Sequence, residues 1–157
     1  MYRTNGFLSL AFAAFFLSAL ASPSRAQGGN ACALLTTAQV TAALGTAVEA
    51  GVPMVASQPT TCGWAPPGGR HIDAKKVTLT LSTPKSFEAA KKPMNGIEKT
   101  PLSGVGDDAI YITTPGFGTG LSVRKGNSAF QVRVGGFKPE QEKQIEKALA
   151  LEILKKV

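Results

Sequence analysis

The first thirty residues constrain this chain more than any other stretch. Arg3 provides a positive charge, and residues 7–21 then read FLSLAFAAFFLSALA, without a charged side chain. A positive start, an apolar run of this length and small residues before a cleavage point are typical of a secretory signal peptide. Ser24 and Ala26 occupy the −3 and −1 positions, so we expect residues 1–26 to be a signal peptide and the mature chain to begin at Gln27.

An uncleaved membrane anchor is the alternative interpretation of this segment. The apolar run is shorter than the roughly 20 residues that a spanning helix needs, and no later stretch has the necessary composition. A lipid anchor would need a cysteine directly after a leucine-rich box of small residues, whereas Cys32 follows Gly-Gly-Asn-Ala. We therefore expect a periplasmic or extracellular protein with no stable membrane insertion after cleavage.

Residues 27–157 would then be a single domain of 131 residues (157 − 26), which is enough to bury a core. Loss of Arg3 and Arg25 takes the 17 basic residues to 15 against 10 acidic ones, a net charge of +5 (15 − 10). The lysines come as scattered pairs rather than as one basic stretch, so no nucleic-acid-binding arm is expected.

The mature chain has two cysteines, Cys32 and Cys62, which we expect to form a disulfide in an oxidising compartment. Closing a loop of about 31 residues contributes about 3 to 4 kcal/mol in the chain-entropy account of disulfide stabilisation. Cys62 and Trp64 alternate onto one face of an extended segment, so Trp64 is expected to shield the bond. A metal site is the alternative, but two cysteines and one histidine leave a structural zinc site incomplete without carboxylates.

Turn and capping residues divide the mature chain into short helices and strands. They predict helices at 36–44, 84–92 and 139–156. Alternating apolar residues and turn signals predict strands at 46–50, 60–65, 76–82, 109–113, 121–125 and 128–134, with a loop at 93–106. Helices between blocks of antiparallel strands indicate the α+β class: a single two-layer domain, mainly antiparallel sheet with helices on one face, and one disulfide.

The hairpin around residues 126–127 is the best-determined local feature. Its Gly-Asn pair fits a two-residue type II′ turn, and counting outward pairs Val123 with Phe130 and Leu121 with Val132. All four are apolar and share one face, so the turn and the alternation predict the same register.

The segment 139–156 is the longest predicted helix. Its expected buried stripe consists of Ile145, Ala148, Leu149 and Ile153. The lysines at 143 and 147 would point toward water.

No arrangement of residues indicates catalysis or a cofactor. His71, the only histidine, follows a glycine turn and is expected to be a solvated loop residue. Asp107 and Asp108 are adjacent on an extended segment, where neighbouring side chains point to opposite faces and do not make a calcium loop. The glycines between 116 and 120 lack the helix and the Lys-Ser/Thr ending of a phosphate loop. We expect no cofactor and no metal.

The glycine-rich segment 114–120 is the candidate contact loop. Phe117 stands between glycines, and an aromatic residue on an exposed loop is a common contact for a partner or ligand. Thr114 and Thr119 are candidate contacts beside it. The alternative is that Phe117 folds back onto the core.

Four short motifs in this order resemble a group of small exported bacterial proteins. They are C-x-L-L-T at 32–36, A-L-G at 43–45, C-x-W at 62–64 and G-V-G-D-x-A at 104–109. The chain is similar to secreted and lipoprotein domains of unknown function that are best known from actinobacteria. The resemblance implies a disulfide-linked α+β envelope domain without established catalysis, with ligand or partner sensing as its role. The chain departs from the lipoprotein members in lacking a lipobox.

The sequence therefore favours an exported, non-catalytic domain that binds an envelope protein or a small ligand. A secreted hydrolase inhibitor, with residues 114–120 inserted into a cleft, is the first alternative. An enzyme that uses Asp107 or Asp108 is the second.

Overall fold

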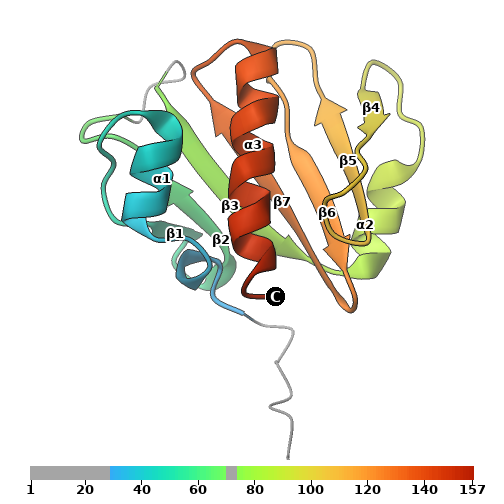
Figure 1. The fold of residues 1–157 in the computed structure, drawn as a ribbon, viewed down its shortest axis with the longest axis horizontal. Helices are drawn as coiled ribbons and strands as arrows, with labels where there is room; N and C mark the ends of the chain where they lie inside the picture. Colours follow the sequence, from blue (N-terminus) through green and yellow to red (C-terminus); the bar gives the residue numbers. More distant parts are fainter. Residues whose placement is uncertain (1–28, 70–73) are drawn as a thin grey trace, which may run out of the picture.

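The computed structural model describes residues 29–69 and 74–157 (Figure 1). The expected signal peptide and His71 lie outside the described residues. In the described part, seven strands form one antiparallel sheet in the order β1-β2-β3-β7-β6-β5-β4, which confirms the predicted α+β class. The elements in chain order are η1 (Ala31–Ala33), α1 (Thr37–Leu44), β1 (Val52–Val55), β2 (Gln58–Trp64), β3 (Lys76–Ser82), α2 (Pro84–Lys91), β4 (Glu98–Pro101), β5 (Asp108–Thr113), β6 (Leu121–Lys125), β7 (Ser128–Gly135) and α3 (Pro139–Leu154).

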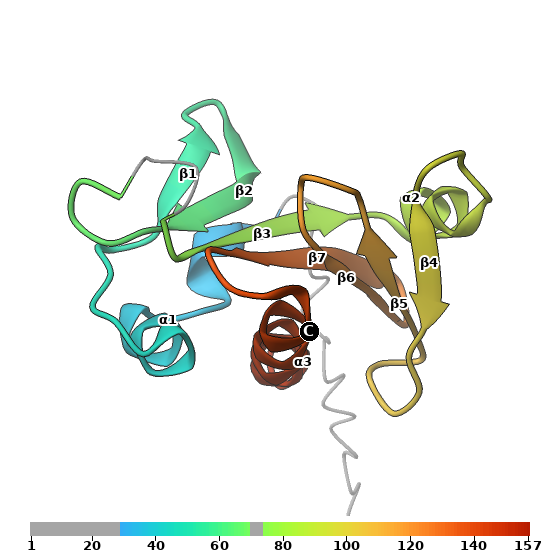
Figure 2. The same ribbon diagram turned by 90° about the horizontal axis from the view of Figure 1, so that it is seen from above.

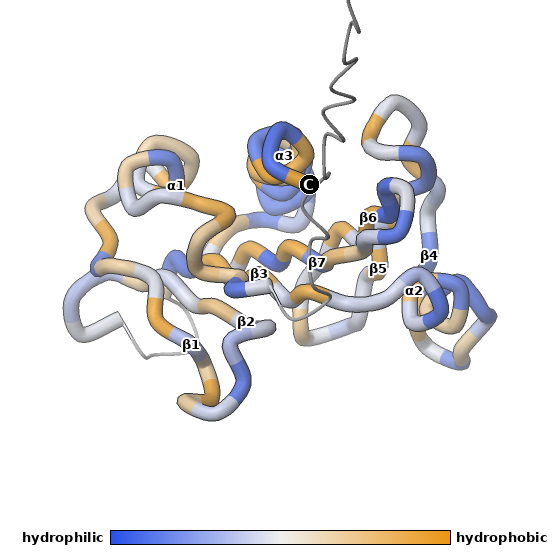
Figure 3. Tube along the Cα trace, turned by 90° about the horizontal axis from the view of Figure 1, so that it is seen from below, coloured by the Kyte–Doolittle hydropathy of each residue, from blue (hydrophilic) through white to orange (hydrophobic). Residues whose placement is uncertain are grey.

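Helices α1 and α3 cover one face of the sheet, whereas α2 lies against the other face (Figure 2). Strand residues alternate between the faces: Tyr111 belongs to the core beneath α3, and its neighbour Ile110 packs with Phe87 of α2. Figure 3 shows this alternation of hydrophobic and hydrophilic residues along β3 and β7. The expectation that the helices share one face therefore holds for α1 and α3 but not for α2, whose single buried residue, Phe87, needs its own small cluster.

The predicted caps define the ends of the first two helices. The Thr36 side chain accepts from the backbone N–H of Gln39, whose side chain accepts from the Thr36 backbone, and Gly45 closes α1 in the left-handed conformation at φ 64°. In α2 the Thr83 side chain accepts from the backbone N–H of Ser86, and Pro84 occupies the first position. The local sequence signals are thus sufficient to position both helices.

The disulfide joins Cys32, the middle residue of η1, to Cys62 in β2, with 5.1 Å between their Cα atoms. Cys62 and Trp64 are both buried in the main core, as their spacing predicts. The bond therefore ties the start of the described chain to the sheet.

The hairpin of β6 and β7 has the predicted register. Val123 lies opposite Phe130 and Leu121 opposite Val132. The β7 strand also pairs with β3 along its whole length, so this hairpin joins the two halves of the sheet.

Two strand predictions were wrong. Residues 46–50 are not a strand, because their ladder contact is limited to the Glu49 N–H bonded to Ala65 O at 2.9 Å; the edge strand β1 begins later. The predicted loop at 93–106 contains β4, which pairs with β5 at the opposite edge. Its residues, Glu-Lys-Thr-Pro, form a strand without apolar alternation because an edge strand can leave them exposed to water.

The buried stripe of α3 was only partly predicted. Leu149 and Ile153 are buried as expected and Ile145 is partly buried, but Ala148 is exposed. Glu142 and Glu146 lie on the buried side instead, and they place two carboxylates between α3 and the sheet.

Candidate functional site

The predicted contact loop, Thr114–Gly120, joins β5 to β6 and closes on itself. The Thr114 N–H donates to Gly118 O at 3.0 Å, and the Phe117 N–H donates to Thr114 O at 2.9 Å. Gly116 and Gly118 have φ of 77° and 79°, a backbone region that favours glycine. The turn leaves Phe117 76% exposed at its tip. The predicted alternative, in which Phe117 folds back onto the core, does not occur.

The three predicted contact residues have different environments. Phe117 is exposed and Thr114 is half-buried, so both are accessible from outside. Thr119 is fully buried, so the prediction that it contacts a partner was wrong. Thr119 lies just before β6 and faces α3, and its hydrogen bonds to that helix hold the loop.

Thr119 is bound by two buried glutamates of α3. Its hydroxyl donates to Glu146, with 3.1 Å to each carboxylate oxygen, and its N–H donates to Glu142 Oε2 at 3.3 Å. The Val134 N–H donates to Glu146 Oε1 at 3.1 Å, and the Phe137 N–H donates to Glu142 Oε1 at 3.5 Å. Glu142 is 4% exposed and Glu146 is 0% exposed. We call Thr119, Glu142 and Glu146 the acidic cluster.

Burial raises the pKa of Glu146 to about 7, and the charge of Glu142 adds to this effect. The hydrogen bonds from Val134 and Thr119 and the charge of Arg133 act in the opposite direction on this pKa. Among the described residues, neither carboxylate has an ion-pair partner. Glu146 therefore changes its charge near neutral pH.

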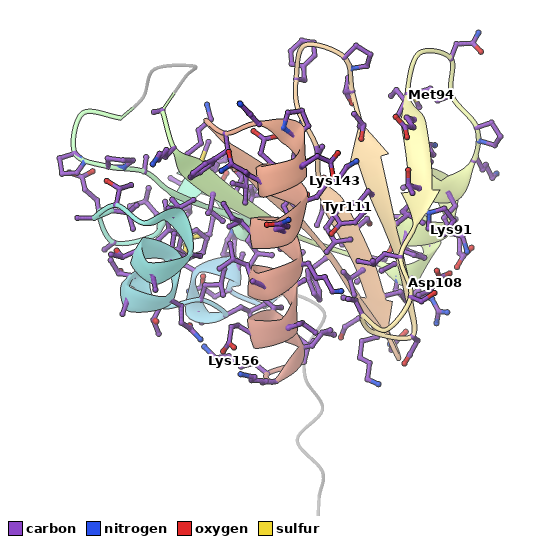
Figure 4. All side chains as sticks on the ribbon, turned by 45° about the horizontal axis from the view of Figure 1, so that its top comes forward. Lys91, Met94, Asp108, Tyr111, Lys143 and Lys156 are labelled. Atoms are coloured by element: carbon purple, nitrogen blue, oxygen red, sulfur yellow. A yellow bond between two sulfur atoms is a disulfide. The ribbon has the colours of Figure 1, made fainter. Side chains whose placement is uncertain are left out.

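Tyr111 of β5 lies near the acidic cluster. Its hydroxyl donates to Lys143 O at 2.8 Å, and the Lys143 ammonium lies 5.9 Å from the centre of its ring (Figure 4). Burial raises the pKa of Tyr111, followed by the charges of Glu146 and Glu140. Tyr111 thereby fixes the first turns of α3 on β5.

Arg133 holds the loop from the other face of the sheet. It stands between the core residues Val132 and Val134 in β7 and so points away from α3. Its Nη2 donates to Phe117 O at 2.8 Å. The loop is thus fixed by a guanidinium from one face and by carboxylates from the other.

A second exposed apolar residue lies at the same end of the sheet. Met94 is 61% exposed in the turn that leads into β4 (Figure 4). The register pairs Glu98 at the start of β4 with Thr113 at the end of β5, so this turn is adjacent to the contact loop. Met94 and Phe117 together form what we call the apolar rim.

Asp107 and Asp108 take part in structural contacts with different partners. Asp107 accepts from the Gly126 N–H at 2.7 Å and from Lys125 Nζ at 3.1 Å, and these two bonds, in that order, lower its pKa. Asp108 accepts from Lys91 of α2 at 2.6 Å (Figure 4). The two carboxylates do not converge on one site.

Hollows of about 500 and 530 Å³ lie on the described surface. The first lies between η1 and the β6–β7 turn, and the second lies beside β1 and reaches Gly69. Neither is lined by the acidic cluster or the apolar rim. Within residues 29–69 and 74–157, no three His, Cys, Asp or Glu residues are grouped to hold a metal ion. The same residues include no helix of the length and apolar composition needed to cross a membrane.

The acidic cluster was missed from the sequence, although a signal was present. Glu142, Glu146, Leu149 and Ile153 follow the 4-3-4 spacing of one helix face. Two acids that continue an apolar stripe indicate buried carboxylates with their own hydrogen-bond donors.

Comparisons with protein-family models, with curated proteins and with solved structures found no match to this chain.

Proposed function

We propose that this chain is an exported, non-catalytic domain that binds an envelope protein through the Thr114–Gly120 loop, with Phe117 as the anchor. The observation that supports this is a large aromatic side chain held in water at the tip of a hydrogen-bonded loop. Burying a phenylalanine in a partner's apolar pocket contributes about 1.5 to 3 kcal/mol.

The hydrogen bonds that hold the loop favour a role in protein recognition over a purely structural role. Arg133 and Thr119 hold the loop on both sides of Phe117, so little conformational freedom remains to be lost on binding. Export is supported by the N-terminal apolar run and by the disulfide, which persists in oxidising compartments.

A crosslinking experiment tests this proposal. The exported chain, carrying a photoreactive phenylalanine analogue at position 117, is irradiated in its native envelope, and the crosslinked protein is identified and purified. Its affinity is then measured for the wild type, Phe117→Ala and Leu151→Ala. Leu151 is a matched control because it is 41% exposed on α3 and lies outside the contact loop.

We expect Phe117→Ala to weaken binding by about tenfold or more and Leu151→Ala to leave it unchanged. Equal affinity of the wild type and Phe117→Ala would contradict the proposal. A crosslink to a small molecule instead of a protein would mean that the loop binds a ligand and not an envelope protein.

A hydrolase inhibitor is the second candidate, and the closed tip of the loop favours it. The bond from the Thr114 N–H to Gly118 O makes the loop narrow enough to enter a cleft with Phe117 first. Incubation of the exported protein with a panel of lysozymes and peptidases tests this function, and it is excluded for these enzymes if all keep full activity.

A further inference from the structure

The contact loop rests directly on the acidic cluster. A Cβ atom placed on Gly118 would lie 2.8 Å from Glu142 Oε2, so the backbone of the loop approaches the carboxylate as closely as glycine allows. Thr119, the next residue, uses both its N–H and its hydroxyl on the two glutamates. The loop cannot move away from α3 without uncovering these carboxylates.

The loop supplies half of the hydrogen-bond donors that the described residues offer to Glu142 and Glu146. Two of these four donors are the N–H and the hydroxyl of Thr119, and the other two are the backbone N–H groups of Val134 and Phe137. If the loop opened, water would replace the Thr119 donors and would solvate Glu146.

The charged groups around Glu146 come from both layers of the domain. Glu142 and Glu140 are on its own helix, and Glu140 is paired with Lys143 at 3.2 Å. The sheet contributes Arg133 of β7 and the Tyr111 hydroxyl of β5. Arg133 is bonded to Phe117 O on the far face, so among the described residues no cation is bonded to a buried negative charge on Glu146.

We propose that the acidic cluster is a proton-operated latch: protonated Glu146 keeps the contact loop closed on α3, and loss of this proton loosens the loop and the Phe117 anchor. The latch deepens the function proposed above, because it regulates the same loop. It makes partner binding strongest in mildly acidic surroundings.

The direction follows from the preference of the closed state for the proton. Burial in the closed state raises the pKa of Glu146 to about 7 from its ordinary value of 4.5 against the opposing effect of the Thr119 hydrogen bond, and an open, hydrated carboxyl returns toward 4.5. Opening therefore becomes easier as the pH rises. If opening restores the full difference, the opening equilibrium constant increases about 30-fold between about pH 5.5 and about pH 8.5.

Amide hydrogen exchange on the exported wild-type protein measures this opening without a partner. Protection factors, corrected for the intrinsic effect of pH on exchange, are compared at about pH 5.5 and about pH 8.5 for the Thr119 amide, which donates to Glu142, and for the central β3–β7 ladder. We expect the Thr119 amide to lose about tenfold or more of its protection at the higher pH while the ladder keeps its own.

Two variants separate the latch from a general effect of pH. Glu146→Gln carries no charge at either pH, so its loop should stay protected at both. Glu140→Gln is the matched control, because Glu140 is an exposed acid in the first turn of the same helix, and it should behave as the wild type.

Loop protection independent of pH in the wild type would overturn the proposal, as would an equal loss of protection in the β3–β7 ladder. The wild-type measurement decides even if Glu146→Gln does not fold. Because no partner is present, a failed latch leaves the Phe117 affinity measurement unaffected, and the two proposals can fail separately.

Discussion

A methyl group added at Gly51 should damage the core, whereas one added at Gly63 should not. A Cβ atom at Gly51 would lie 2.4 Å from Cε2, 2.5 Å from Nε1 and 2.8 Å from Cζ2 of Trp64. Trp64 is a buried, rigid ring of the main core, so it cannot relieve the conflict by rotating a flexible chain into water. A Cβ atom at Gly63 would lie 2.5 Å from Met54 Sδ, but Met54 is a flexible side chain and 60% exposed.

Overpacking of a rigid core lowers the free energy of unfolding by about 1 to 3 kcal/mol. Because three ring atoms conflict with the added Cβ, we expect Gly51→Ala to lower it by about 2 to 3 kcal/mol. In thermal unfolding this is a decrease in Tm of about 7 to 10 °C for a domain of this size. Gly63→Ala should change the free energy of unfolding by less than about 0.5 kcal/mol, because Met54 can rotate into water. Equilibrium denaturation followed by the fluorescence of the single tryptophan measures both variants. A Gly51→Ala protein as stable as the wild type, or a Gly63→Ala protein that loses as much, would refute this reasoning.

Three further predictions concern the charge, the disulfide and the start of the chain. Folding raises the pKa of Glu146 to about 7 from 4.5, so the contribution of this group to stability is complete below about pH 4.5 and is lost as the pH rises to about 7. In denaturation experiments at higher pH, the free energy of unfolding of Glu146→Gln should therefore rise by up to about 3 kcal/mol relative to the wild type. Parallel curves of stability against pH for the two proteins would contradict this. Replacing Cys32 and Cys62 with Ser should lower the free energy of unfolding by about 3 to 4 kcal/mol, and an unchanged denaturant midpoint would count against the disulfide as a main stabiliser. Intact mass spectrometry of the exported protein should give a chain that begins at Gln27 with no free thiol, whereas retention of residues 1–26 would contradict cleavage.

The elements predicted best from the sequence are those in which two independent local signals agree. The β6–β7 hairpin has both a Gly-Asn turn and a matching alternation, and α1 has both a capping box and a closing glycine. Where the edge of the sheet removes the need for apolar residues, as in β4, pattern reasoning has no signal to use.

The acidic cluster shows a different limit of prediction. The expected stripe was built from apolar residues alone, so Ala148 was predicted to be buried and Glu146 was left out, whereas in the structure Ala148 is exposed and Glu146 is buried. Burial of Glu146 depends on residues outside its own helix: Thr119 of the contact loop and Val134 of β7 supply its hydrogen bonds. The exposure of Phe117 depends in the same way on Arg133, whose reach across the sheet is set by the β6–β7 register.

The central β3–β7 ladder determines when the chain can fold. Leu79 pairs with Val132, 53 residues later (132 − 79), and α3, which covers this ladder, follows still later. Long-range pairings form slowly because a large loop must close before any contact is gained. A nascent chain that lacks about its last 40 residues therefore has no covered core and stays unfolded enough to pass through a membrane. Such delayed folding suits the export that we propose, since the polypeptide can cross a membrane as an extended strand and acquire its disulfide and its sheet on the far side.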